Sequence, residues 1–176
     1  MPSYREKRQN SRAIITGGTI PYHVEWIAPD LNLIYMCSLP VTMDSIGSGV
    51  NLTIYSTTLT PVTVTIGLAN HRGRVIKHSR QTTTMNVPVS TDDGTTLSFP
   101  FHKKVELKKN KTYFILVQFR ANIGEALLVY FSNDHISKAC FVLPLCSSVA
   151  GNLSTIKNIS PPTTFVNRTA PSGNLY

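Results

Sequence analysis

Acidic residues, long apolar runs and closely spaced cysteines are all scarce in this chain of 176 residues. Only 15% of the residues are charged, whereas about 25% is usual, and this excludes a long charged helical bundle. Nine Asp and Glu residues face 17 Lys and Arg residues, so the formal net charge is +8. No run approaches the roughly 18 apolar residues of a membrane-spanning helix, and no apolar segment follows the basic first residues as in a signal peptide. We therefore expect no membrane partner.

Cysteine and histidine lack the spacing of disulfides or metal ligands. The cysteines are Cys37, Cys140 and Cys146. Their odd count without close pairing predicts small buried apolar side chains in a reducing compartment. His71 and His78 lie at opposite ends of a candidate strand, and their odd separation would place them on opposite faces. We expect neither a metal nor a cofactor.

Motifs of catalysis are also missing. The chain contains no G-x-S-x-G, H-E-x-x-H, C-x-x-C or glycine-rich phosphate loop. The adjacent carboxylates Asp92 and Asp93 are typical of a solvated turn. A catalytic triad scattered along the sequence leaves no motif, so an enzyme stays an open alternative. The sequence favours a structural or binding protein, and we expect no enzyme activity.

Hydroxyl-bearing residues are abundant, because 36 of the 176 residues are Ser or Thr. Apolar and polar residues alternate with period two in the middle of the chain, which is the pattern of half-buried antiparallel strands. The clearest run alternates apolar residues with threonines: Val62, Val64, Ile66 and Leu68 with Thr63 and Thr65. Asn70–Gly73 then predicts a hairpin turn, residues 74–78 the returning strand, and residues 79–96 a long loop or weak edge strand.

Residues 113–119 are apolar on both faces, which predicts the central strand of a sheet. The turn before them contains Asn110, a residue that tolerates the left-handed conformation. Residues 97–101 and 103–107 predict two short strands, and residues 139–145 predict a last strong strand. In all we expect eight to ten strands at spacings of about ten residues, and no helix.

These elements predict an all-β protein, an antiparallel β-sandwich of jelly-roll topology with extended N- and C-terminal arms. The sandwich domain is expected at residues 20–146. A basic N-terminal arm at residues 1–19 and a C-terminal tail at residues 147–176 flank it. Both arms are too polar to form a core of their own, so we expect neighbouring subunits to hold them.

Two basic clusters stand out. The first twelve residues carry a net charge of +3, which predicts binding to an acidic surface, either protein or nucleic acid. A second cluster surrounds Glu106 and contains five lysines: Lys103, Lys104, Lys108, Lys109 and Lys111. Such a cluster can neutralise phosphates, but lysines on turns and edge strands also prevent unwanted strand pairing. We call residues 102–111, which contain these five lysines, the lysine hairpin, and for it we favour the role of preventing strand pairing.

Three features between Pro61 and Phe131 form a pattern: the run Val62–Leu68, the turn with Gly73, and the run Val105–Ile115, whose hairpin leads into a strand beginning Thr-Tyr. This stretch resembles the β-sandwich domains of tailed-phage virion accessory proteins, which include capsid cement or decoration proteins and head- or tail-fibre domains. Asn110 stands where these domains usually have Gly. The resemblance implies a non-catalytic protein of the virion, a decoration subunit that binds the major capsid protein or other virion proteins and forms a trimer.

The resemblance also implies that the polar arms clasp neighbouring subunits of a capsid lattice. Basic residues of the N-terminal arm would be electrostatic anchors, and apolar residues of both arms would be pegs. The anchors are Arg5, Lys7, Arg8 and Arg12, and the pegs are Ile14, Ile15, Ile20, Phe165 and Val166.

Two other binding functions stay open. A receptor- or carbohydrate-binding module of a phage head or tail fibre would need exposed aromatic residues. The candidates are Tyr4, Tyr22, Tyr35, Tyr55 and Trp26, although the core is the usual place for most such side chains. A small icosahedral coat protein would use the basic arm to bind packaged nucleic acid. The four basic residues of that arm are sparse for this task, so nucleic acid is the less favoured partner.

Overall fold

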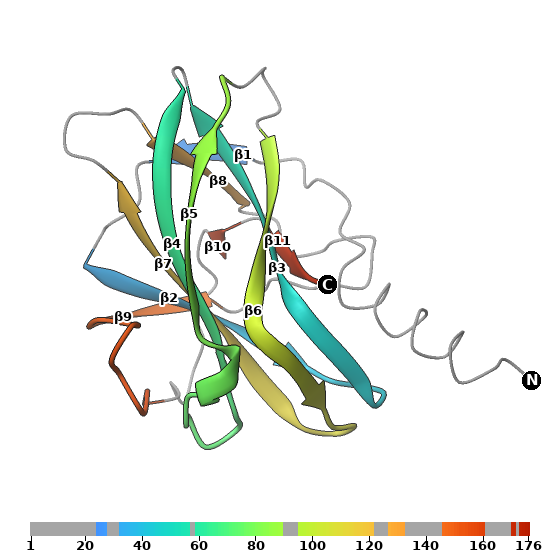
Figure 1. Ribbon diagram of the computed structural model, residues 1–176. Coiled ribbons are helices and arrows are strands. Elements are labelled where there is room, and N and C mark those ends of the chain that lie inside the picture. Colours follow the sequence, from blue (N-terminus) through green and yellow to red (C-terminus); the bar gives the residue numbers. More distant parts are fainter. Residues whose placement is uncertain are drawn as a thin grey trace, which may run out of the picture.

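Two antiparallel sheets pack face to face in the computed structural model of the chain (Figure 1). The structure describes residues 24–27, 32–56, 59–89, 95–121, 127–132, 146–160, 170–171 and 173–176. These residues form strands, connections and one 3-10 turn, with no α-helix among them. The prediction of an all-β antiparallel sandwich is therefore confirmed.

The first sheet has five strands and contains the strand predicted to be central. In sheet order these strands are β5 (Gln81–Val87), β4 (Thr60–Ala69), β7 (Thr112–Ala121), β2 (Leu33–Pro40) and β9 (Cys146–Ala150). β7 occupies the middle position, which confirms the prediction made from its two apolar faces. β5 is an edge strand, so residues 79–96 follow the edge-strand alternative over part of their length.

The second sheet is built around the long strand β3. Its strands are β1 (Val24–Ile27), β8 (Leu127–Ser132), β3 (Ser45–Ser56), β11 (Gly173–Leu175), β6 (Thr95–Leu107) and β10 (Ala170–Pro171). β6 pairs with β3, and β10 pairs with β8. The two short strands expected at 97–101 and 103–107 are a single strand, because its pairing with β3 continues beyond a register shift opposite Gly47 and Gly49.

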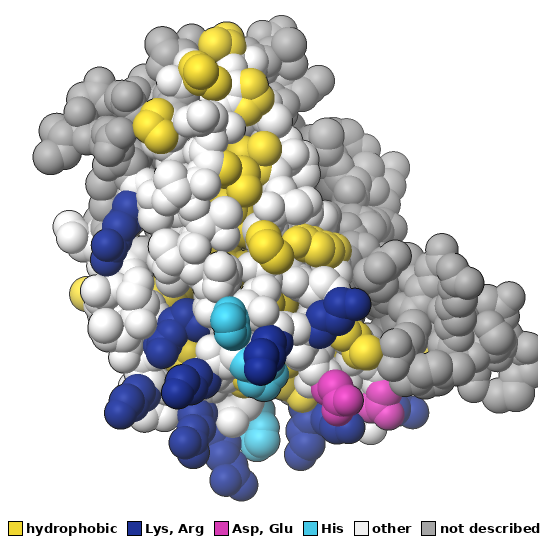
Figure 2. All heavy atoms as spheres, viewed as in Figure 1, with side chains coloured by type: hydrophobic (Ala, Val, Ile, Leu, Met, Phe, Trp, Pro, Cys, Tyr) yellow, Lys and Arg dark blue, Asp and Glu magenta, His cyan; other side chains and the backbone are white. Residues whose placement is uncertain are grey.

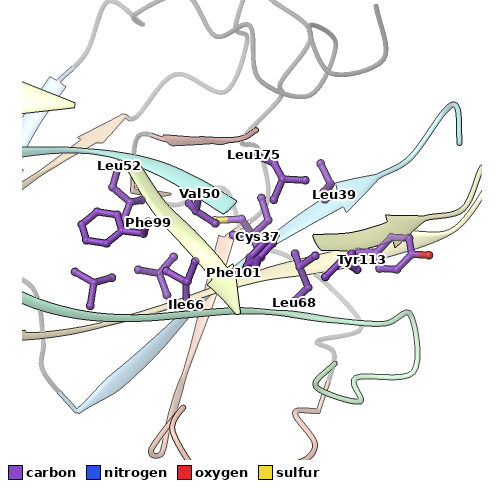
Figure 3. Packing of buried hydrophobic residues seen from close by; sticks show 14 of the residues in the cluster. Cys37, Leu39, Val50, Leu52, Ile66, Leu68, Phe99, Phe101, Tyr113 and Leu175 are labelled. Carbon is purple, nitrogen blue, oxygen red and sulfur yellow. The ribbon is translucent and has the colours of Figure 1, made fainter. Parts of the chain in front are cut away.

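The main core lies between the two sheets. The four alternating apolar residues of β4 are buried there with Phe99 and Phe101 of β6. Figure 3 shows labelled side chains from both sheets, among them Phe99 and Ile66, in the space between the ribbons. On the other face of β4 the Thr63 and Thr65 hydroxyls meet the Thr84 and Thr82 hydroxyls of β5 at 2.8 and 2.9 Å.

The connection between β4 and β5 differs from the expected hairpin. Its turn at residues 70–73 is present, with Gly73 at φ 85°, but residues 74–78 are not the returning strand. Instead the chain forms the 3-10 turn η1 (Lys77–Ser79) before β5 begins. Buried Ser79 holds this turn, because its hydroxyl donates to the Ile76 carbonyl at 2.6 Å and accepts from the Leu68 amide at 2.8 Å. The connection carries His71 and His78 as exposed residues, so the argument from opposite strand faces does not apply to them.

Residues 146–160 belong to the sandwich, so the expected boundary at 146/147 falls inside β9. Beyond β9 the chain covers the outer face of the first sheet, where Leu153 and Ile159 pack in a second buried cluster with Phe114 and Leu116 of β7. These two apolar side chains help to attach a polar segment to the sheet. The predicted strand at 139–145 lies outside the described residues.

Two glycines of β3 make room for the last residues of the chain. A Cβ added at Gly47 would meet the Leu175 side chain, and one at Gly49 would meet the Phe99 carbonyl and the Tyr176 ring. Leu175 is 1% exposed. The Tyr176 amide donates to the Gly49 carbonyl at 3.0 Å, and partial burial raises the pKa of the Tyr176 phenol above 10.0.

Candidate functional site

Basic side chains gather at one end of the sandwich. Among the residues whose side chains are described, eleven are Lys or Arg and only Asp44 and Glu106 are acidic. Figure 2 shows that most of these basic side chains, together with the visible histidines, lie on the lower end of the molecule in that view. The basic residues are Arg72, Arg74, Lys77, Arg80, Lys103, Lys104, Lys108, Lys109, Lys111, Arg120 and Lys157. We call the part of the surface that carries all of them except Arg120 the cationic end.

Hydrogen bonds between connections hold the cationic end together. The Val41 amide donates to the Lys111 carbonyl at 3.0 Å, and the Asn110 amide donates to the Val41 carbonyl at 2.8 Å. The connections β2–β3 and β6–β7 are therefore joined. Asn110 has a φ of 63°, as its place in the turn predicted. The Val75 amide donates to the Lys157 carbonyl at 2.9 Å, which joins the β4–β5 connection to the segment after β9.

The charges of the cationic end are almost unneutralised. Within the described part of the chain the one ion pair joins Lys108 Nζ to Glu106 Oε2 at 3.5 Å, and both side chains are exposed. Asp44 accepts a hydrogen bond from the Lys109 backbone amide at 2.8 Å. Clustered charges of one sign without counter-charges attract anions and orient their approach. This end of the molecule can therefore bind a polyanion.

A pocket of about 640 Å³ opens on the cationic end. Its walls are the β4–β5 connection and the segment after β9, and no carboxylate lines it. The lining residues are Asn70, Arg74, Val75, Ile76, Lys77, Arg80, Ile156 and Lys157. The apolar part of the lining belongs to the folded body, since Val75 is buried and Ile76 and Ile156 pack against the two cores.

Arg80 is the cation of the pocket whose side chain is held by hydrogen bonds. Its Nη1 donates to the Ile156 carbonyl at 2.7 Å and to the Leu153 carbonyl at 3.4 Å. Both acceptors are neutral, so the hydrogen bonds fix the guanidinium without cancelling its charge. Asn70 shapes the other end of the same wall, because its Oδ1 accepts from the Arg72 and Arg74 amides at 2.9 and 3.0 Å.

The structure places the lysine hairpin in two settings. Lys108, Lys109 and Lys111 lie on the exposed β6–β7 turn, whereas Lys103 and Lys104 lie on β6 where its register against β3 shifts. β6 pairs only with β3 among the described strands. Lysines on such an edge suit the interpretation that they prevent unwanted pairing, and the same residues add to the cationic end.

The nine predicted anchors and pegs all lie outside the described residues. Sequence reasoning overlooked the pocket, although three of its cations, Arg74, Lys77 and Arg80, lie in a stretch without acidic residues. A count of charges between residues 71 and 80 could have found them. The sequence around Lys157 does not indicate a site, because Lys157 is far from residues 74–80 in the chain and only folding brings it to the same pocket.

Other kinds of site find less support in the described part of the chain. No three His, Cys, Asp or Glu side chains described there could together hold a metal ion. The large hydrophobic side chains exposed there are Leu59 and Val89, neither of them aromatic. Of the aromatic candidates, Tyr35 packs edge-to-face on Phe119 with ring centroids 6.1 Å apart. No helix in the described ranges has the length and hydropathy to cross a membrane.

Comparison of the chain with the known protein families finds no match, and comparison with curated proteins finds none either. The resemblance to virion accessory proteins therefore stays a prediction.

Proposed function

We propose that this chain is a structural protein of a virion, a decoration subunit that stabilises the shell by binding an acidic surface of the capsid protein. The observation that carries this proposal is the cationic end, which presents unneutralised lysines and arginines on a rigid sandwich. The basic residues of the N-terminal arm would extend the same contact. Attachment, not chemistry, is the activity of such a subunit.

The physical basis is the sum of many weak interactions. An exposed ion pair contributes about 0–1 kcal/mol, so no single lysine would decide the affinity. Several such pairs formed together, and repeated in a trimer, would give tight binding through a high effective concentration. Binding of this kind weakens with salt, because dissolved ions screen charges beyond a Debye length of about 8–10 Å at moderate ionic strength.

The test begins with particles purified from material that expresses the chain. An antibody against the chain should detect it in the particle fraction of a density gradient at low salt and in the soluble fraction after a high-salt wash, while the shells stay intact. Stripped shells should then rebind the purified protein. Absence of the chain from the particle fraction at both salt concentrations would contradict the proposal.

Charge reversal identifies the contact surface. Lys103→Glu with Lys104→Glu should reduce rebinding to stripped shells more than tenfold, since each pair of like charges at an interface opposes association. Arg120→Glu is the control. The strand β7 begins beside the cationic end at Thr112, and Arg120 lies eight residues further along it, away from that end. The control variant should change rebinding by less than about twofold. Equal effects of both changes would argue against the cationic end as the contact.

A second function is favoured by the same charges. In a small coat protein the cationic end would face packaged nucleic acid, and the folded body would supply the basic residues in which the N-terminal arm is sparse. Here the chain would itself form the shell, so a high-salt wash that leaves particles intact would release none of it. Ultraviolet crosslinking of particles would then join the chain to nucleic acid.

A further inference from the structure

We propose that the pocket between the β4–β5 connection and the segment after β9 is a binding site for a phosphate group. Its cationic ligands are Arg74, Lys77, Arg80 and Lys157. The inference goes beyond the proposed function and does not depend on it, although the pocket belongs to the cationic end. It adds a defined site and a ligand chemistry to a surface that otherwise attracts anions without selecting among them.

Arg80 is a partly buried cation in a pocket that no carboxylate lines. This side chain is half-buried, and its Nη1 is bound by the Ile156 and Leu153 carbonyls. Removing a cation from water costs free energy unless an anion or a hydrogen-bond acceptor compensates it. The two carbonyls satisfy only part of the guanidinium, which has five N–H donors. An anion in the pocket would accept from the remaining donors and supply the missing counter-charge.

The four cations line one pocket, and hydrogen bonds join the backbone of its two walls. Lys157 comes from one wall, and the other three cations come from the opposite wall. Two backbone bonds tie the walls together, from the Val75 amide to the Lys157 carbonyl at 2.9 Å and from the Ile159 amide to the Gly73 carbonyl at 2.8 Å. Arg74 and Asn158 also form a β-bridge. The backbone under the cations is thus fixed before a ligand arrives, which reduces the entropy lost on binding.

The charge and size of the pocket indicate the class of anion that it suits. Four cations without a carboxylate suit a group that carries up to two charges on several oxygens, as a phosphate does, better than a single carboxylate. The volume of about 640 Å³ exceeds that of a phosphate ion alone. Val75, Ile76 and Ile156 add apolar surface beside the cations, which suits the sugar or base of a phosphate ester. A free nucleotide and a nucleic-acid strand share this chemistry.

The test uses the full chain and two probes, adenosine monophosphate and a short poly-dT oligonucleotide. Binding is followed by fluorescence anisotropy for the oligonucleotide and by NMR shifts of the Gly73, Val75 and Lys157 amides for both probes. Lys77→Gln with Lys157→Gln removes two pocket charges and leaves the Arg80 hydrogen bonds intact. The matched control is Lys109→Gln with Lys111→Gln, which removes two charges of the cationic end outside the pocket.

We expect the pocket variant to weaken binding of the oligonucleotide, the nucleotide or both by at least tenfold and to abolish the amide shifts. The control variant should weaken binding by no more than about threefold, since Lys109 and Lys111 do not line the pocket and an exposed charge away from the bound phosphate contributes little. Arg80→Lys should also weaken binding, because an ammonium group cannot reproduce the fixed guanidinium geometry.

The two probes distinguish the sources of the phosphate. Displacement of the oligonucleotide by the nucleotide would assign the site to small phosphate esters. Oligonucleotide binding that needs the pocket residues, with no binding of the nucleotide, would assign the site to a nucleic-acid strand.

Equal losses in the pocket and control variants would overturn the site and leave diffuse attraction, with the proposed function intact. Failure of both probes to bind would also overturn the site. Rebinding of the pocket variant to stripped shells is measured alongside. If that variant loses phosphate binding but still rebinds shells, the pocket binds phosphate and is not needed for attachment to the shell.

Discussion

Gly49 illustrates how much one residue decides when two chain segments meet. Its backbone lies against the Phe99 carbonyl and the Tyr176 ring, so the position has no room for a side chain. The backbone amide and carbonyl of Gly49 also form the ladder with Tyr176. Neither constraint can be read from the local sequence Gly47-Ser48-Gly49, because Phe99 and Tyr176 lie far away along the chain. Asn110 is the opposite case, because the demands of a tight turn are local and its left-handed conformation was predictable.

Gly49→Ala should lower the free energy of unfolding by about 1–3 kcal/mol, since the methyl group forces the tightly packed segment to move. Gly67→Ala is the matched control, because a Cβ there would make ordinary contacts, the nearest with the Ser79 hydroxyl oxygen at 3.5 Å. We expect the control to change stability by less than about 1 kcal/mol. Urea denaturation measures both, and equal destabilisation would contradict the close packing at Gly49.

At the scale of elements, the segment 151–160 packs on the outer face of the first sheet. Buried Gln118 of β7 holds it, because its Nε2 donates to the Gly151 carbonyl at 2.7 Å and its Oε1 accepts from the Leu153 amide at 2.7 Å. The amide nitrogen and the amide oxygen of this buried side chain therefore each have a hydrogen-bond partner. Leu153 and Ile159 then anchor the segment by burial. The segment in turn forms one wall of the pocket, so the site depends on this attachment.

Gln118→Ala should lower the free energy of unfolding by about 2–4 kcal/mol, because one buried and one part-buried hydrogen bond to the backbone are lost, each contributing about 1–2 kcal/mol. Hydrogen exchange should become faster at the Leu153 and Ile156 amides. Gln81→Ala on edge strand β5 is the control, since that side chain is half-buried and has no comparable hydrogen bonds in the described part of the chain. Unchanged protection at Leu153 in the Gln118 variant would show that apolar burial alone holds the segment.

At the scale of the whole molecule, the charged side chains lie on the surface and the basic ones are concentrated at one end. Eleven basic and two acidic side chains occupy the described surface, and most of the basic ones share one end. Repulsion among like charges destabilises the folded state, because unfolding lets them move apart. Most of these charges lie on the connections between strands, and Lys103 and Lys104 lie on β6. A ligand or partner of opposite charge would relieve the repulsion.

Moderate salt should therefore raise the melting temperature. We expect an increase of a few degrees between about 20 and about 200 mM sodium chloride, where screening over the spacing of these side chains becomes effective. Lys104→Gln should raise the melting temperature at low salt and reduce its dependence on salt, whereas Arg120→Gln should do neither. Scanning calorimetry measures both. A melting temperature that falls with added sodium chloride would contradict the inference that repulsion among the surface charges destabilises the fold.

The sequence by itself determined the properties that depend on near neighbours. Alternation with period two is imposed by the geometry of a strand, so the strands β4 and β7 and the central place of β7 were predictable from their side chains. The tertiary structure alone decided the rest. It turned residues 74–79 into a bent connection, because Ser79 is fixed by Leu68, a residue eleven positions away. It also brought Lys157 beside Arg80, because loop ends far apart along the chain are joined by backbone bonds that no local pattern records.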